Sequence, residues 1–157
     1  MQTESARMSS AAEARFRVQA PNSLPRAIAV IALDAAAADV VTRLATDGWR
    51  HTTFYTSTSA GALHDLAGAP RPLHDAVAAA DLVVLVAGAG GLAHAAAEVG
   101  RACSDRRVTT TGFLVGAAAA PPREISKTLA QLRPWSLMVV IAETDEYIGD
   151  MMAALRA

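Results

Sequence analysis

The sequence predicts an α/β fold of the Rossmann-like, doubly wound type, with a mostly parallel five-stranded sheet and helices on both faces. Short runs that are almost entirely apolar, such as "AIAVIAL" (27–33) and "DLVVLVA" (81–87), alternate with longer segments of helical periodicity. Strands that are apolar throughout are typical of a sheet covered on both faces. The composition is 52% hydrophobic but only 4% aromatic, which favours close-packed helices on a sheet over an all-β sandwich.

The first half of this pattern begins with the strand 27–33. "AAADVVTRLATDGW" follows as a helix with Val40, Val41 and Leu44 on one face, and Gly48 is suited to ending it. The β-branched and aromatic run "HTTFYTSTS" predicts a second strand. The next segment, 62–80, is helical in propensity but is interrupted by one glycine and two prolines.

The second half predicts three more strand–helix pairs. The strand 81–87 precedes the helix "GLAHAAAEVGRACSD", and "RVTTTGFLVGA" is the fourth strand. "PPREISKTLAQLRPW" is a helix with prolines in its first turn, which is a favourable position for proline. "SLMVVIA" is the fifth strand, and "DEYIGDMMAALRA" is a final helix.

Length and charge limit the classes of function. We expect a mobile N-terminal tail over 1–25 and a single domain over 26–157. The formal net charge of −1 gives no field that would attract nucleic acid or an anionic membrane. No apolar run approaches the roughly 20 residues of a membrane helix, and the N-terminus has no signal-peptide core. We therefore expect a cytoplasmic protein that binds neither nucleic acid nor membrane.

A glycine-rich break follows the strand 81–87. Gly88, Gly90 and Gly91 can adopt positive φ and allow a ligand close to the backbone. The helix that follows offers unpaired N–H groups and a positive dipole end, which favour an anion. In a doubly wound sheet this break faces the end of the first strand, at Leu33 and Asp34, across a ligand-binding crevice. The same pattern is also ordinary loop chemistry, and the two interpretations stand side by side.

From about Arg26 to the C-terminus, the order of segments resembles the nucleotide-binding half of the FtsZ/tubulin-type GTPases. "ADLVVLVAGAGG" (80–91) is similar to the family's glycine-rich phosphate loop. "VTTTGFLVGA" (108–117) is similar to its next strand, and "LAQLRPWSLMVVIAETDEYI" (129–148) to the strand that leads to its guanine side. The resemblance implies a Rossmann-like domain and a nucleotide site whose key positions have changed.

The positions that differ from the family are those that would contact the nucleotide. "LDAAAAD" (33–39) stands in place of a glycine-rich first loop, and Asp34 puts negative charge where phosphates would lie. Asp39 and Glu143 replace asparagines of the family, so that groups that donate and accept become acceptors only. The family's hydrolysis loop and second domain lie beyond the matched segment. We therefore expect no GTPase activity and no cofactor, with GTP or another nucleotide kept as an alternative ligand.

The leading functional hypothesis is a non-hydrolysing, degenerate FtsZ-like domain that acts through protein–protein association, as an assembly or regulatory subunit. Apolar residues of the last helix, among them Tyr147, Ile148, Met151 and Met152, favour a homodimer or a complex with another protein. The alternative is a small-ligand site in the acidic crevice bounded by the residues already named: Asp34, Asp39, Gly88, Gly90, Gly91 and Glu143. A third hypothesis is an unrelated flavodoxin-like enzyme.

The remaining reactive side chains form no recognised motif. The single cysteine, Cys103, is interpreted as a small buried hydrophobe. The four histidines show no metal-binding spacing, so the sequence predicts no metal site. His94 is close enough to the glycines to face the crevice, although an exposed neutral histidine is the simpler interpretation.

Overall fold

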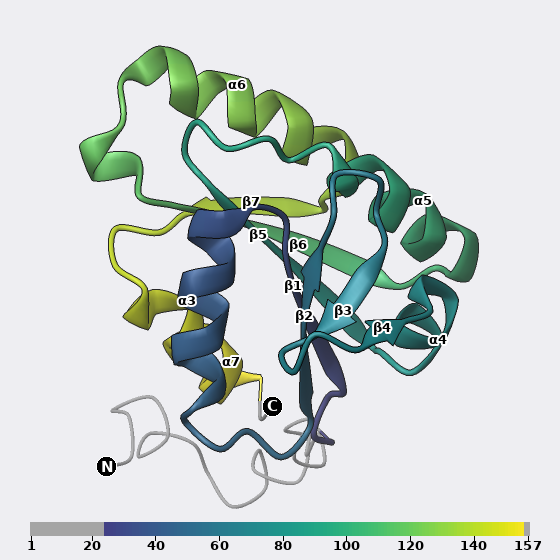
Figure 1. Ribbon diagram of the computed structural model, residues 1–157. Coiled ribbons are helices and arrows are strands. Elements are labelled where there is room, and N and C mark those ends of the chain that lie inside the picture. The colour runs from purple at the N-terminus through teal and green to yellow at the C-terminus, as the bar shows by residue number, and fades with distance from the viewer. Residues whose placement is uncertain (1–23, 156–157) are drawn as a thin grey trace, which may run out of the picture.

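The computed structural model describes residues 24–155, which form a seven-stranded sheet with helices on both faces (Figure 1). The predicted tail, 1–25, lies outside the described residues except for its last two positions. In chain order the strands and α-helices are β1 (Ile28–Ala32), α3 (Ala35–Ala45), β2 (Thr52–Ser57), β3 (Leu63–Asp65), β4 (Pro70–Arg71), α4 (Leu73–Ala78), β5 (Leu82–Gly88), α5 (Ala95–Arg106), β6 (Thr109–Val115), α6 (Pro122–Leu132), β7 (Met138–Ile141) and α7 (Glu146–Ala154).

The sheet has the order β4-β3-β2-β1-β5-β6-β7, and the five predicted strands, β1, β2, β5, β6 and β7, are all parallel. From β1 the chain adds β2 on one side, and later adds β5, β6 and β7 on the other. The strand order therefore reverses between β1 and β5, which is where doubly wound sheets bind ligands. The predicted α/β fold class is confirmed.

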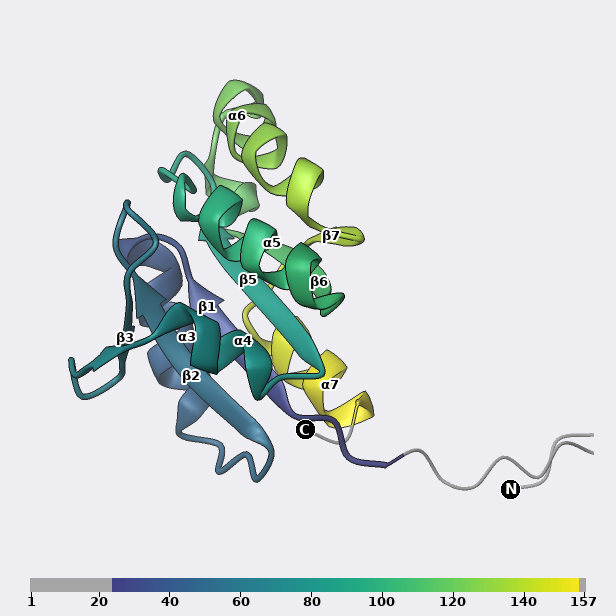
Figure 2. The same ribbon diagram turned by 90° about the vertical axis from the view of Figure 1, so that its right-hand side faces the viewer.

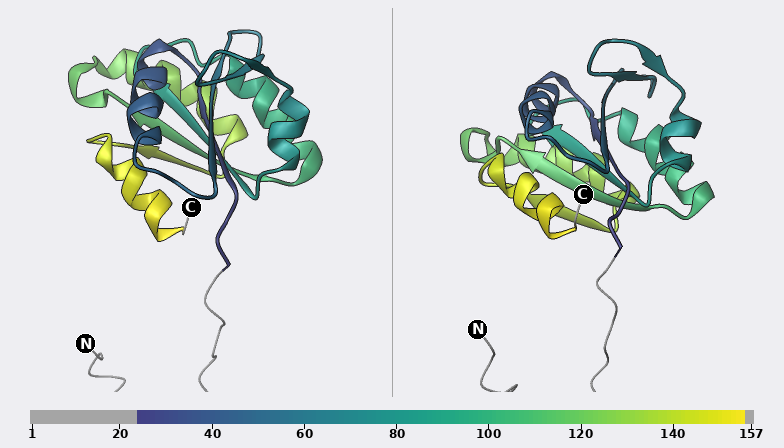
Figure 3. Two further views of the ribbon diagram at one scale, coloured as in Figure 1. Left: turned by 60° about the horizontal axis from the view of Figure 1, so that its bottom comes forward. Right: turned by 90° about the horizontal axis from the view of Figure 1, so that it is seen from below.

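Alternate residues of the strands divide the core into two clusters, as the period of two requires. Val30, Val84 and Phe113 face α3 and α7, whereas Ile31 and Leu85 face α4 and α5. Figure 3 shows α3 and α7 together on one side of the sheet and α4 and α5 on the other. Side chains of the central strands β1 and β5 are almost completely buried, because both faces are covered.

The segment 62–80 differs from its helical expectation, because its first half forms an antiparallel hairpin, β3–β4. Asp65 organises the turn. Its Oδ1 accepts the Ala67 and Ala69 N–H groups at 3.0 and 2.9 Å, and its Oδ2 accepts Arg71 Nη2 at 2.8 Å. These bonds hold the pKa of the Asp65 carboxyl below its ordinary value, the Ala69 bond being the largest cause. The glycine and prolines outweigh helix propensity here, and only α4 remains helical.

The last helix, α7, packs on the sheet more fully than expected. Ile148 and Met152 are completely buried in the core cluster on the α3 side, so these two residues are not the uncovered surface that the sequence suggested. Tyr147 is 53% exposed, and its ring centroid lies 6.5 Å from that of Phe113. Exposed apolar side chains lie instead in or beside β7, among them Leu137, Met138 and Ile141. β7 is the last strand of the sheet, and its ribbon is labelled in Figure 2.

Two smaller features complete the fold. Cys103 is buried under α5 as predicted, and burial raises the pKa of its thiol above the ordinary value. No helix within residues 24–155 is long and apolar enough to cross a membrane.

Candidate functional site

Asp34 and Gly88 lie side by side at the carboxyl ends of β1 and β5, as the sequence predicted. The two strands are in register from Ile28 and Leu82 onward, and the Leu33 N–H donates to the Val86 carbonyl at 2.9 Å. Gly88 N–H donates to Asp34 Oδ2 at 2.8 Å. The switch point of the sheet is therefore closed by a carboxylate that belongs to the chain itself.

Asp34 also begins α3. It is the N-cap residue, with extended backbone, and its Oδ1 accepts the Ala37 N–H at 2.8 Å. Aspartate is a favoured N-cap, because its carboxylate satisfies an orphan N–H and lies at the positive end of the helix dipole. Both oxygens of Asp34 thus accept backbone N–H groups. An anion at the end of β1 would seek donors of this kind.

The three glycines of the loop are required by close packing more than by φ. Only Gly90 has a positive φ, of 83°. A Cβ at Gly88 would lie 2.9 Å from Ala36 Cβ, one at Gly90 would lie 2.6 Å from Glu124 Oε2, and one at Gly91 would collide with the Asp34 carboxylate. The space beside each glycine is therefore filled by the protein, and two of the groups that fill it are carboxylates.

Five of the six N–H groups from Gly88 to Ala93 are paired within the chain, whereas the start of α5, where the sequence predicts free donors, has no side-chain cap from His94. Gly90 N–H donates to Thr128 Oγ1 at 3.1 Å, and Ala93 N–H donates to Gln131 Oε1 at 2.9 Å. Gly88 N–H donates to the Asp34 carboxylate, as described above. Ala89 N–H donates to the Val115 carbonyl, and Gly91 N–H donates to the Gly88 carbonyl.

Helix α6 supplies three of the side chains that contact the loop, and the sequence did not indicate this connection. Glu124, Thr128 and Gln131 lie on one face of this helix at spacings of four and three residues, in line with the loop. Thr128 is fully buried, and its hydroxyl donates to the Glu124 carbonyl at 3.2 Å while it accepts from Gly90. The polar stripe is visible in the sequence as E-x-x-x-T-x-x-Q, from Glu124 to Gln131.

Other predicted members of the site lie apart from this pair. Asp39 is exposed on α3, in the turn after its first. Glu143 is exposed after β7, and two strands, β5 and β6, separate β7 from β1, a distance of about 14 Å. His94 is exposed, with Nδ1 3.4 Å from Gln131 Nε2. The structure brings together Asp34 and the three glycines, and it does not bring Asp39 or Glu143 to them.

The arrangement does not fit a phosphate at the glycine loop. A phosphate needs free N–H donors and a positive field, and here the N–H groups of the three glycines are paired and the neighbours, Asp34 and Glu124, are acidic. A guanine nucleotide, as the family resemblance implies, would have to displace the Asp34 carboxylate from Gly88. No catalytic nucleophile or base is positioned by these contacts.

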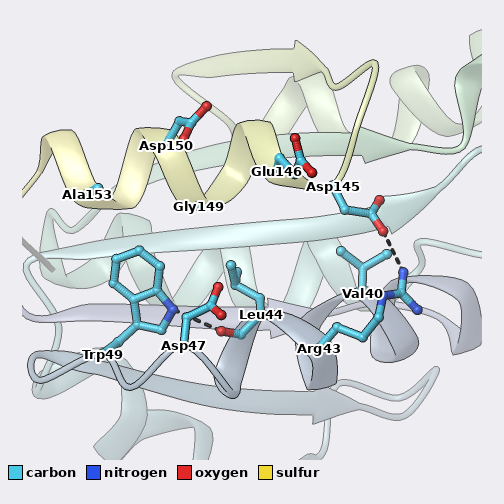
Figure 4. A pocket seen from close by; sticks show the side chains of 10 residues that line it. All are labelled: Val40, Arg43, Leu44, Asp47, Trp49, Asp145, Glu146, Gly149, Asp150 and Ala153. Atoms are coloured by element: carbon cyan, nitrogen blue, oxygen red, sulfur yellow. Dashed lines mark hydrogen bonds and ion pairs between the residues drawn. The ribbon is translucent and has the colours of Figure 1, made fainter.

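A second hollow, of about 460 Å³, lies between α3 and α7 (Figure 4). Trp49 is held on one side by a 3.0 Å bond from Nε1 to the Leu44 carbonyl, and Arg43 bridges to Asp145 at 2.5 Å. The lining residues are Val40, Arg43, Leu44, Asp47, Trp49, Asp145, Glu146, Gly149, Asp150 and Ala153. Within residues 24–155, no group of three His, Cys, Asp or Glu side chains is placed to share a metal ion. The groove is an acidic, solvated surface between two helices.

The fold and the strand-end contacts define a doubly wound α/β protein whose switch point is filled by its own side chains. No protein-family model matches the chain, and no curated protein matches it significantly. Among solved structures the fold is similar to that of the empty FtsZ dimer from M. jannaschii, with 11% identity and a TM-score of 0.46. The match covers 94% of this chain but only 57% of the FtsZ chain. A likeness this distant carries no inference about binding or activity.

Proposed function

We propose that this protein is a non-hydrolysing α/β domain, degenerate at its nucleotide site, that acts through protein–protein association as an assembly or regulatory subunit. The observation that carries the proposal is the Asp34 carboxylate, which bonds both to Gly88 N–H and to the first turn of α3. The N–H groups of Gly88 and Ala37, which could otherwise bind an anion, already donate to the Asp34 carboxylate. This carboxylate is part of the chain and cannot dissociate.

Electrostatics supports the same conclusion. A phosphate oxygen about 5 Å from the Asp34 carboxylate would be repelled by about 0.8 kcal/mol in water, and several-fold more in a partly dry crevice. Glu124, whose Oε2 lies against Gly90, adds a second negative charge on the other side of the loop. Each phosphate charge of a triphosphate would meet this repulsion in addition to the loss of the Asp34 hydrogen bonds.

Association is supported by an apolar surface at the other end of the sheet. Leu137, Met138, Ile141 and Tyr147 are exposed by 83, 52, 48 and 53%. They lie in or next to β7, which is uncharged along its length. Large apolar side chains exposed on both faces of an uncharged edge strand are typical of a protein–protein contact.

Isothermal titration calorimetry with GTP and with GDP, each in Mg²⁺, tests the nucleotide part of this proposal. We expect no binding heat, no thermal stabilisation and no phosphate release above the buffer rate. A ligand present at a hundredfold its Kd stabilises by about 2.7 kcal/mol, so even a weak site would be visible in thermal melts. Stoichiometric binding of GTP at micromolar Kd would contradict the proposal, and binding of an amine or nucleoside instead would favour the small-ligand alternative.

A further inference from the structure

We infer that the partner at β7 is a second copy of this chain, with the two β7 strands paired antiparallel about a two-fold axis that passes beside Val139. The inference rests on the proposed function, because it names the partner and the surface for the association proposed there. It is carried by the backbone, the side chains and the charges of one short strand.

The backbone of β7 has one paired edge and one open edge. Within the described residues β7 pairs only with β6, from Thr111 opposite Met138 to Leu114 opposite Ile141. The Leu137 N–H donates inward to the Thr110 carbonyl at 2.8 Å. At the other end of the strand the Ala142 N–H donates to the Leu114 carbonyl at 2.9 Å, in register with the ladder. Since backbone groups of successive residues alternate between the two edges, those of Met138 and Val140 are directed to β6, and those of Val139 and Ile141 are directed outward. An open, uncharged strand edge is a template for another strand.

The two-fold register makes this edge complementary to itself. With Val139 at the axis, the outward-directed backbone groups of Val139 face the same groups of the other copy, and Met138 of one copy lies opposite Val140 of the other. The same register sets Leu137 opposite Ile141. These are the two most exposed side chains among the odd-numbered residues from 137 to 141. Residues opposite each other in an antiparallel pair must lie on the same face of the sheet. This condition is met, because each pair joins two even-numbered or two odd-numbered residues. An isologous contact needs such self-complementarity.

Charges at the two ends of the strand favour the antiparallel direction. Arg133 precedes β7 and is exposed, whereas Glu143 and Asp145 follow it and are exposed. Antiparallel pairing brings the basic end of one copy near the acidic end of the other. Parallel pairing would place like charges together at both ends, which is unfavourable.

The face of the sheet beneath α7 has room for the second copy. Met138 and Val140 line a mainly apolar hollow of about 370 Å³, whose other lining residues are Phe113, Tyr147, Met151 and the single carboxylate Asp150. Because Met138 of the second copy lies opposite Val140 in this register, its flexible side chain reaches the mouth of the hollow. Methionine fills irregular apolar gaps of this kind well.

Sedimentation velocity of the full 157-residue chain between about 1 and 100 µM tests the inference by mass action. We expect the wild type to approach twice the 16.2 kDa chain mass, and the double variant Met138→Lys/Ile141→Lys to remain at the chain mass. Leu66→Lys is the matched control, because Leu66 is 40% exposed and lies in the hairpin at the opposite end of the sheet. This control is expected to dimerise like the wild type. Circular dichroism melts verify that the lysine variants are folded.

A cysteine at the axis tests the register. Val139→Cys is expected to form a disulfide between two copies under mild oxidation, because identical residues face each other there. Leu66→Cys, at the opposite end of the sheet, is expected to stay reduced, and the native Cys103 is buried. A dimer in which the Val139→Cys pair fails to cross-link refutes pairing about Val139.

The outcomes separate this inference from the proposed function. A wild type that stays monomeric throughout the range, or a folded double variant that dimerises undiminished, overturns the inference and leaves the nucleotide part of the proposal standing. Tight binding of GTP by a protein that dimerises through β7 contradicts the proposal that the nucleotide site is degenerate. It leaves the inferred pairing of the two β7 strands intact.

Discussion

Replacing Asp34 with alanine perturbs the closed switch point most directly. The substitution removes the α3 N-cap bond, worth about 1 kcal/mol with a range of about 0.5–2. It also leaves the N–H of Gly88, a buried residue, without its 2.8 Å acceptor, which costs about 1–3 kcal/mol. The expected loss of unfolding free energy is therefore about 2–4 kcal/mol. At an m value of about 1.5 kcal/mol/M, the urea midpoint falls by roughly 1.5–2.5 M.

Urea unfolding followed by circular dichroism measures this loss. Asp39→Ala is the matched control, since Asp39 is an exposed carboxylate on the same helix, and its expected effect is within about 0.5 kcal/mol. Asp34→Asn keeps a good N-cap and one acceptor oxygen, so it should fall between the two. If Asp34→Ala and Asp39→Ala have the same midpoint, the Asp34 carboxylate does not hold the strand ends together, and the reasoning about the filled site fails with it.

Three further substitutions and one thiol reagent test other parts of the fold. Because the pKa of Asp65 is lowered from its ordinary value of 3.8, chiefly by the bond from the Ala69 N–H, its bonds stabilise the fold at pH above that value, and the contribution is lost as the pH falls through the lower folded pKa. The stability difference between wild type and Asp65→Asn, measured by urea unfolding, should therefore be full at neutral pH and should shrink as the pH is lowered below 3.8; a constant difference would contradict this. Cys103 should resist a thiol reagent until the protein is unfolded, since it is buried and its thiol pKa is raised, and rapid native labelling would show that α5 opens. Gly149→Ala should raise stability by about 0.5–1 kcal/mol, as the new Cβ lies at an ordinary 3.5 Å from its nearest neighbour. Gly100→Ala should lower it by about 1–3 kcal/mol, because its Cβ would lie 2.6 Å from Trp135, and equal thermal midpoints for the two variants would refute the packing argument.

The fold could be predicted from the sequence because its signals are local. Continuous apolar runs separated by helical periods specify β1, β5 and β7 without any knowledge of tertiary contacts. The hairpin β3–β4 was missed because its specification is a side chain, Asp65, that bonds to backbone groups two and four residues ahead. The alanines and leucines of the segment 62–80 favour a helix by propensity. Propensity does not include a turn that depends on hydrogen bonds from backbone N–H groups to one side chain.

The site could be predicted only where it depends on strand order. Adjacency of Asp34 and Gly88 follows from the switch point of a doubly wound sheet, and the structure shows it. The partners from α6 could not be found that way, because which helix face lies over the loop depends on how α6 packs. Glycines that look free to receive a ligand turn out to be glycines because Asp34 and Glu124 approach them closely.

The strand at the far end of the sheet gives a limit on how large an assembly can become. β4 contains two residues, one of which is Pro70, and proline has no N–H with which to extend a ladder. Arg71 places a charge beside it. If the two β7 edges pair as inferred, the outer strand left at each end of the joined sheet is this two-residue strand with its proline and arginine. Such an edge is a poor template for a further strand, so the inferred pairing would not by itself lead to a growing chain of subunits.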